Sequence, residues 1–316
     1  MRIVIPGGSG HLGAVLARSL LAGGHEVAVL TRRPGSASPW RETAWEGRTV
    51  GPWIREIEGA DAVINLAGRS VNCRYGKRNL KEMMDSRVDS TRAVGQAISL
   101  VRKPPAVWLQ MSTATIYAHR FDAPNDEATG KLGGDEPDAP RFWRASIEIA
   151  KAWERAQAEA NTPSTRKALL RTAMVMGKGS GGPFDLLEKL ARWGLGGPLA
   201  GGGQYMSWIH ERDFARAVAF LLERADLSGP FNLAAPNPLP QREFMAALRA
   251  VSGRRLALPA TKWMLEAGSF VLRTETELVL KSRRVVPGRL LQAGFRFEFP
   301  DWAAAARDLL ERRAAA

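Results

Sequence analysis

Residues 2–24 read RIVIPGGSGHLGAVLARSLLAGG, and they predict a strand, a glycine turn and a helix in immediate succession. The apolar run Ile3–Ile5 is typical of a buried strand. After the turn, apolar residues recur at the spacing of one helix face until Gly23 and Gly24 end the pattern. A glycine-rich turn between a strand and a helix is the context in which a dinucleotide-binding fingerprint is meaningful.

The glycines of this turn have separate expected tasks. Gly7 lets the chain leave the strand sharply, Gly10 lets backbone approach a pyrophosphate, and Gly13 lets the helix pack close to the sheet. The free N–H groups at the helix start and the positive end of its dipole favour phosphates. A turn without a ligand is the alternative. For His11 we expect the backbone to matter more than the ring. The predicted cofactor contacts are Gly7, Gly8, Ser9, Gly10, His11, Leu12 and Gly13.

The predicted second strand, 25–31, ends in basic residues. In this fold that strand end faces the adenosine ribose, where an acid accepts from the 2′-hydroxyl of NAD and an arginine accommodates the 2′-phosphate of NADP. Arg32 and Arg33 follow Thr31, with no acid at the strand end. The sequence therefore predicts NADP(H) as the cofactor. The alternative is that one or both arginines only face solvent.

Another apolar run, 61–68, predicts a strand and its C-terminal turn. Ligands of open parallel sheets lie outside the carboxyl ends of the strands. We therefore expect the cofactor to pass along Asn65, Leu66, Ala67 and Gly68, where small residues leave room for it.

Strand and helix patterns continue to alternate as far as Met176. Such alternation predicts an α/β fold with a doubly wound parallel sheet, which is a Rossmann domain over 1–176. We expect a strand near 230–234 to complete the sheet. The remainder, 177–316, predicts a smaller, mixed, mostly helical region that covers the strand ends and binds substrate. Within it, the glycine-rich stretch 194–203 predicts a loop, since no strongly periodic helix follows.

The composition excludes several classes of protein. The chain has 316 residues, 45% hydrophobic and 24% charged, as in ordinary soluble domains. No apolar run reaches the ~20 residues of a membrane span, and we expect neither a membrane partner nor a secretion signal. The single cysteine, Cys73, excludes an internal disulfide and a cysteine-rich zinc site, and it fits a reducing, cytoplasmic compartment.

The net charge of +13 is spread along the chain, with 45 basic and 32 acidic residues intermixed. No basic tail or stripe interleaved with aromatic residues stands out, as nucleic-acid binding would favour. We therefore expect a solvated surface and no nucleic-acid partner.

The segment Ser112–Tyr117, STATIY, together with the glycine turn, resembles the extended short-chain dehydrogenases/reductases. In sugar-nucleotide epimerases of that group this segment carries the catalytic Ser or Thr, and the resemblance implies this role for Thr113. A closer similarity is to the atypical "epimerase family" proteins, which are NAD-dependent epimerase/dehydratase-like and have a Rossmann domain and a C-terminal domain of unknown function, here 240–316. It runs essentially end to end and is carried by INLAG (64–68), SRVDSTR (86–92), MSWIH (206–210) and VPGRLLQAGFRF (286–297).

Typical short-chain reductases use a Tyr-x-x-x-Lys pair, in which the tyrosine delivers a proton and the lysine lowers its pKa and holds the nicotinamide ribose. Acid–base catalysis of this kind contributes ~10²–10⁴-fold. In the best register Ile147 stands at the tyrosine position and Lys151 at the lysine position. The resemblance thus implies that Lys151 is a catalytic and cofactor-binding residue, and the usual proton donor is missing.

Three functions fit this pattern. The first is an NADP-dependent oxidoreductase or epimerase-like enzyme acting on a small carbonyl or hydroxyl substrate, with a displaced acid from Tyr117, Tyr205 or His210. The second is a redox sensor or scaffold that binds NADP(H) without turnover, and the third is a non-redox enzyme that uses the cofactor structurally. The candidate catalytic residues are Thr113, Lys151 and Tyr117, and no metal is expected.

We expect the substrate pocket to lie between the two parts of the chain, over the nicotinamide. Arg69 and Arg74 would favour an anionic substrate there. A structural role is the more typical one for His210, a core position for Trp153, and an incidental thiol for Cys73. The expected pocket residues are Thr113, Tyr117, Phe184, Tyr205, Ser207 and Trp208.

Overall fold

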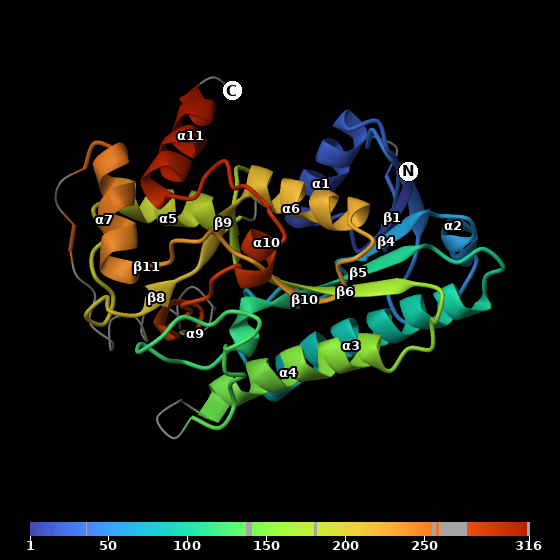
Figure 1. Ribbon diagram of the computed structural model, residues 1–316. Coiled ribbons are helices and arrows are strands. Elements are labelled where there is room, and N and C mark those ends of the chain that lie inside the picture. Colours follow the sequence, from blue (N-terminus) through green and yellow to red (C-terminus); the bar gives the residue numbers. More distant parts are fainter. Residues whose placement is uncertain (36, 137–140, 180–181, 255–256, 259–276, 315–316) are drawn as a thin grey trace.

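A parallel sheet of seven strands forms the centre of the computed structural model, which describes the chain apart from residues 36, 137–140, 180–181, 255–256, 259–276 and 315–316 (Figure 1). Every neighbouring pair in this sheet runs parallel. The chain winds outward from β1 and then reverses to β4, so the predicted doubly wound α/β fold is confirmed. The strands, in spatial order, are β10 (Gly229–Leu233), β6 (Arg166–Thr172), β5 (Val107–Thr113), β4 (Ala62–Asn65), β1 (Arg2–Pro6), β2 (Glu26–Thr31) and β3 (Arg41–Ala44).

Helices cover both faces of this sheet, which is why its central strands read as continuous apolar runs. Helices α1 (His11–Ala22) and α6 (Glu211–Glu223) lie on one face, and α3 (Lys77–Leu100) and α4 (Arg141–Ala158) lie on the other (Figure 1). The short α2 (Ile54–Ile57) packs on α3.

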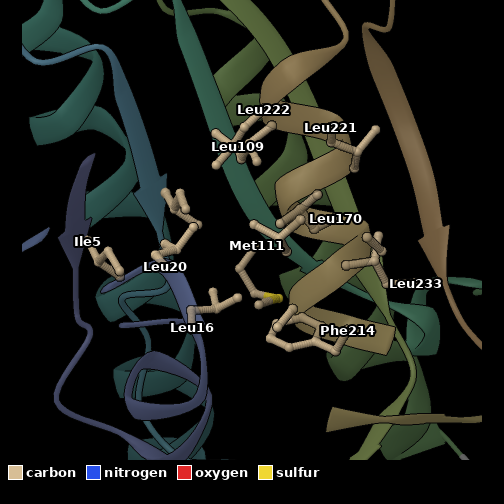
Figure 2. Close-up of a cluster of buried hydrophobic side chains, with 14 of the residues drawn as sticks. Ile5, Leu16, Leu20, Leu109, Met111, Leu170, Phe214, Leu221, Leu222 and Leu233 are labelled. Atoms are coloured by element: carbon tan, nitrogen blue, oxygen red, sulfur yellow. The ribbon is translucent and has the colours of Figure 1, made fainter. Parts of the chain in front are cut away.

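Each face has its own apolar core. On the α1 and α6 side, Leu16 and Phe214 meet Ile5 and Leu170 of the strands (Figure 2). These four side chains are fully buried, and each such burial contributes about 1.5–3 kcal/mol. Trp153 of α4 is buried among apolar side chains, as expected.

The C-terminal part extends beyond the sheet. It carries two small strand pairs, β7 (Met174–Met176) with β9 (Trp208–His210) and β8 (Tyr205–Met206) with β11 (Leu239–Pro240). No strand or helix is assigned within 194–203, as predicted. The remaining helices in the described residues of the C-terminal part are α5 (Pro183–Arg192), α7 (Gln241–Val251), α9 (Glu277–Leu280), α10 (Gly288–Gln292) and α11 (Trp302–Ala314), while the 3-10 turn η1 (Ala114–Ile116) directly follows β5.

Two of the expected pocket residues belong instead to the core of this part. Phe184 and Trp208 are 1% and 0% exposed, and both rings pack on Trp302. Their prediction as pocket residues was wrong, because α5, α7 and α11 need large apolar side chains to fill the space between them.

His210 has the structural role that its sequence context favoured. Its Nδ1 accepts from the Arg212 N–H (3.1 Å), which caps α6, and its Nε2 lies 3.1 Å from Asp308. The ring is fully buried and stacks on Phe299.

Among the described residues, no helix combines the length and apolarity that crossing a bilayer requires.

Candidate cofactor and catalytic site

The glycine turn between β1 and α1 packs against the turn that follows β4. Gly7 has a φ of +74°, a conformation that favours glycine, and its N–H donates to the Leu30 carbonyl (2.8 Å). A Cβ at this position would lie 2.5 Å from the Cα of Ala67. The two turns at the carboxyl edge of the sheet therefore approach closely only because residue 7 is glycine.

Gly13 and Gly10 differ sharply in their surroundings. A Cβ on Gly13 would lie 2.1 Å from the Gly8 carbonyl oxygen, so this glycine permits the close packing of α1 on the turn. A Cβ on Gly10, the N-cap of α1, would meet nothing within 4 Å. No described side chain caps α1, and its first turn has no acid, so its first N–H groups keep the donor capacity that a diphosphate needs.

The His11 ring lies beside the segment that follows β7. A Cβ on Gly182 would lie 3.3 Å from Nε2 of His11, and one on Gly179 would lie 3.7 Å from Nδ1. Burial is the main reason that the pKa of His11 falls below its ordinary value. Nε2 is buried and has no hydrogen-bond partner among the described residues, so this half-buried ring still offers a polar atom.

The turn after β4 is held by a buried amide. Asn65 Nδ2 donates to Gln110 Oε1 (2.9 Å), and Asn65 Oδ1 accepts from the Ala67 N–H (3.1 Å). Asn65 thus shapes the turn, while Leu66, Ala67 and Gly68 occupy the carboxyl end of β4 beside Gly7.

Two exposed arginines directly follow the end of β2. Thr31 is buried, and its Oγ1 accepts from the Arg33 N–H (3.4 Å). The side chains of Arg32 and Arg33 are exposed, and neither forms an ion pair with another described residue. Both guanidinium groups are therefore available to an anionic ligand at the end of β2.

Thr113 ends β5 and lies at the same edge of the sheet as the glycine turn, because the strands are parallel. It is half-buried, and its Oγ1 accepts from the Thr115 N–H (3.2 Å). This hydrogen bond starts η1 and leaves the hydroxyl proton free for another acceptor.

Lys151 lies on α4 one turn after Ile147. Ile147 is 1% exposed and is covered by the turn at Gly133 and Gly134. A Cβ on Gly133 would lie 2.8 Å from Cδ1 of Ile147, and one on Gly134 would lie 3.5 Å from Nζ of Lys151. The position at which the resemblance places the proton donor is thus aliphatic and closed over.

Tyr117 is 2% exposed and takes part in a buried hydrogen-bond network. Its hydroxyl donates to Asn232 Oδ1 (2.9 Å) and accepts from Arg171 Nη1 (3.0 Å), and Arg171 is paired with Glu154 (2.8 Å). Burial raises the pKa of Tyr117 above its ordinary value. Both uses of this hydroxyl are internal, and they join β10, β6 and the end of η1.

A polar cluster that sequence reasoning missed lies beside Thr113 and α4. Ser146 Oγ donates to Glu277 Oε2 (2.5 Å), and the Tyr75 hydroxyl is hydrogen-bonded to Ser146. Lys281 Nζ donates to the Thr115 carbonyl (2.8 Å) and lies 3.9 Å from Glu277 Oε1. We call Tyr75, Ser146, Glu277, Lys281 and Arg283 the buried polar cluster.

Burial dominates the electrostatics of this cluster. It lowers the pKa of Lys281 to about 8 and raises the pKa of Tyr75 above its ordinary value. Arg283 Nε donates to Thr115 Oγ1 (3.2 Å), which brings a second cation to the segment after Thr113. No local sequence motif predicts the cluster, because its members come from three distant segments.

The loop after Gly68 contributes less charge than the sequence suggested. The Arg69 guanidinium forms an ion pair with Glu82 and donates to Asn79 Oδ1 (2.9 Å), so one of the two arginines expected to attract an anion already has a carboxylate partner. Cys73 is half-buried beside Met83 (Sγ to Sδ 3.8 Å). The described residues contain no group of three or more His, Cys, Asp or Glu side chains suited to a metal ion.

Comparison with known proteins identifies the family. The model of the NAD dependent epimerase/dehydratase family matches residues 3–234, and that of a domain of unknown function, DUF1731, matches 260–309. Epimerase family protein SDR39U1 of Bos taurus is 33% identical over 314 residues, which cover 98% of this chain and 100% of that protein. Epimerase family protein YfhF of Bacillus subtilis is 29% identical over 320 residues, 99% of each chain.

A solved structure shows the same fold with a cofactor. Human epimerase family protein SDR39U1 (isoform 2), crystallised with NADPH, superposes with a TM-score of 0.85 at 30% identity, covering 98% of this chain and 99% of that one. The resemblance inferred from the sequence motifs is therefore confirmed, and the chain belongs to the NAD dependent epimerase/dehydratase family.

Proposed function

We propose that the protein binds NADP(H) and acts as an oxidoreductase or epimerase-like enzyme on a small carbonyl or hydroxyl substrate. One observation carries the proposal. The open N-terminus of α1 at Gly10 and the exposed Arg32 and Arg33 lie at the carboxyl edges of the adjacent strands β1 and β2. A diphosphate and a ribose 2′-phosphate need these two features.

The residues present fit the cofactor. The space at Gly10 and the unpartnered Nε2 of half-buried His11 stand on the diphosphate side. The crystal structure of human SDR39U1 with NADPH supports the choice of NADPH over NADH. A bound nicotinamide supplies or accepts a hydride, and the chain must position the substrate and manage the proton.

Thr113 and Lys151 are the residues that we assign to substrate and ribose binding. Thr113 lies at the carboxyl end of β5 with its hydroxyl proton uncommitted, so it can donate to a substrate oxygen. Lys151 stands one helical turn beyond the sealed Ile147. Residues 1–176 would hold the cofactor, and 177–316 would contribute the substrate side, in a cytoplasmic protein.

The closed, aliphatic Ile147 position favours a second candidate, which is a sensor or scaffold that binds NADP(H) without turnover. The two candidates share the cofactor site and differ only in whether a proton donor reaches the substrate.

A titration of NADPH and NADH fluorescence tests the cofactor assignment. In Arg32→Ala/Arg33→Ala we expect the Kd for NADPH to rise at least about ten- to a hundredfold, because even one charged hydrogen bond to the 2′-phosphate contributes about 1.5–3 kcal/mol, while the Kd for NADH stays the same. Arg92→Ala, which removes an exposed arginine of α3, is the matched control. Failure of the wild-type protein to bind either nucleotide at millimolar concentration contradicts the proposal.

Turnover is tested by NADPH consumption with a panel of aldehydes, ketones and sugar nucleotides. Consumption that depends on substrate and is lost in Thr113→Ala supports the enzyme. Tight binding without consumption across the panel supports the sensor.

A further inference from the structure

The tyrosine position of the family motif cannot deliver a proton in this chain. Ile147 has no titratable group, and the turn at Gly133 and Gly134 lies over it. The backbone of that turn is fixed by Glu136, which accepts from the N–H groups of Gly134 (2.6 Å) and His119 (2.8 Å). A donor must therefore come from another side of α4.

The residue before Ile147 leads to such a donor. Successive residues of a helix are rotated by about 100°, so Ser146 projects from α4 in a different direction from Ile147. Its hydroxyl meets Tyr75, which lies in the loop after β4. This loop begins with Leu66–Gly68, which borders the glycine turn.

Hydrogen bonds and one ion pair link Tyr75 to Thr113. Ser146 bridges Tyr75 and Glu277, and Lys281 bridges Glu277 and the Thr115 carbonyl. The Thr115 N–H then donates to Thr113 Oγ1. Loop, helix and C-terminal segment thus bring a phenol into one polar cluster with the expected catalytic hydroxyl.

Two other polar side chains near Thr113 are less suitable donors. The Tyr117 hydroxyl is used by Arg171 and Asn232 within the core. Lys281 is 1% exposed and its Nζ donates to a backbone carbonyl. Tyr75 is only partly buried, unlike Tyr117 and Lys281.

We propose that Tyr75 is the catalytic acid of this protein, with Ser146 and Glu277 as positioning residues that hold its hydroxyl. The inference rests on the proposed function, since it assumes a carbonyl substrate reduced at the cofactor site.

The proton balance of the step is simple. The carbonyl carbon would gain a hydride from reduced nicotinamide, which would be oxidised in the same step. As the carbon–oxygen π pair moves onto the oxygen, the Tyr75 O–H bond breaks and the new alcohol O–H bond forms. Burial and Glu277 disfavour the phenolate, and Arg283 opposes them, so the phenol keeps its proton until the step and the phenolate then regains a proton from solvent water.

The first experiment observes the phenol without turnover. The chain has three tyrosines, so the protein labelled with ¹³C at tyrosine Cζ gives three signals, assigned by single Tyr→Phe variants. On saturation with NADP⁺ we expect the Tyr75 signal to move and the Tyr117 signal, from the buried network, to stay in place. A Tyr75 signal that does not move while NADP⁺ binds overturns the Tyr75 assignment and leaves the proposed function intact.

The second experiment uses a carbonyl compound that supports NADPH consumption. Tyr75→Phe should lower kcat about 10²–10⁴-fold with the Kd for NADPH within twofold of wild type. Ser146→Ala should lower kcat more than it changes KM, and Ser146→Thr, which keeps a hydroxyl, should recover most of the rate. An unchanged kcat in Tyr75→Phe refutes the assignment. Absence of NADPH binding by the wild-type protein removes both proposals together.

Discussion

The cofactor end and the proton-transfer end of this site are built from different materials. The cofactor end is formed by backbone, because Gly7, Gly10 and Gly13 set how closely β1, α1 and the turn after β4 approach. At the other end, the buried polar cluster assembles side chains from the loop after β4, from α4 and from the segment around α9. The cofactor end depends on the lack of side chains at its glycines, and the other end depends on the polar side chains that are present.

This difference explains how each end responds to change. A backbone-built site fails when a Cβ is added, since the polypeptide cannot move aside cheaply. A side-chain cluster fails when one polar partner is removed, since the remaining buried groups lose their hydrogen bonds. Adding a side-chain atom should therefore damage the cofactor end, and removing a polar group should damage the other end.

The largest effect is expected from Gly13→Ala. Its Cβ would lie 2.1 Å from the Gly8 carbonyl oxygen, so α1 must shift away from the turn. We expect the free energy of unfolding to fall by about 3 kcal/mol. A displacement of about 1 Å costs a site about a hundredfold, and we expect NADPH affinity to fall at least that far. Denaturant unfolding and fluorescence titration measure the two effects.

Gly10→Ala is the matched control for that variant. Gly10 has a φ of −83°, which alanine adopts freely, and a new Cβ there would meet nothing within 4 Å. The free energy of unfolding should stay within about 0.5 kcal/mol of the wild-type value, while NADPH binding weakens. Equal loss of stability in both alanine variants would show that packing, and not ligand space, explains the glycine at position 10.

The cofactor end could be predicted from sequence because its determinants are local. Strand, turn and helix occupy the consecutive residues 2–22, and Arg32 and Arg33 directly follow the next strand. Glycine spacing and apolar periodicity report such local geometry directly. The parallel sheet followed from the same patterns.

The other end could not be predicted, because its contacts span most of the chain. Ser146 meets Glu277 across 131 positions, and Lys281 meets Thr115 across 166. Apolar periodicity carries no information on which polar side chains face one another over such separations. Phe184 and Trp208 were misassigned for the same reason, since only the packing of α5, α7 and α11 decides that they fill a core.

A smaller effect is expected from pH, which should change the free energy of unfolding through the buried polar cluster. The pKa of Lys281 falls from 10.5 to about 8 on burial near Arg283, with Glu277 and Glu136 opposing. Between these values the unfolded chain binds more protons, so the free energy of unfolding rises with pH in that range. Going from pH 7 to pH 10, wild type should gain about 2.5 kcal/mol relative to Lys281→Met.

Denaturant unfolding of both proteins at the two pH values measures this difference. Groups other than Lys281 titrate in both proteins, so their contributions cancel. Parallel pH profiles for wild type and Lys281→Met would mean that the ammonium is not desolvated, and that the buried polar cluster is open to water. Gly10→Ala should follow the wild-type pH profile, because the backbone-built end titrates nothing in this range.

The smallest effect is expected from Tyr117→Phe, a variant that can be compared with Tyr75→Phe in the same chain. Removal of the Tyr117 hydroxyl takes one partner each from Asn232 Oδ1 and Arg171 Nη1, and Arg171 keeps its pair with Glu154. We expect a loss of about 1 kcal/mol in the free energy of unfolding, with the Kd for NADPH unchanged within twofold. If instead Tyr117→Phe lowers kcat a hundredfold at unchanged stability, Tyr117 and not Tyr75 supplies the proton, and the core network must open during the reaction.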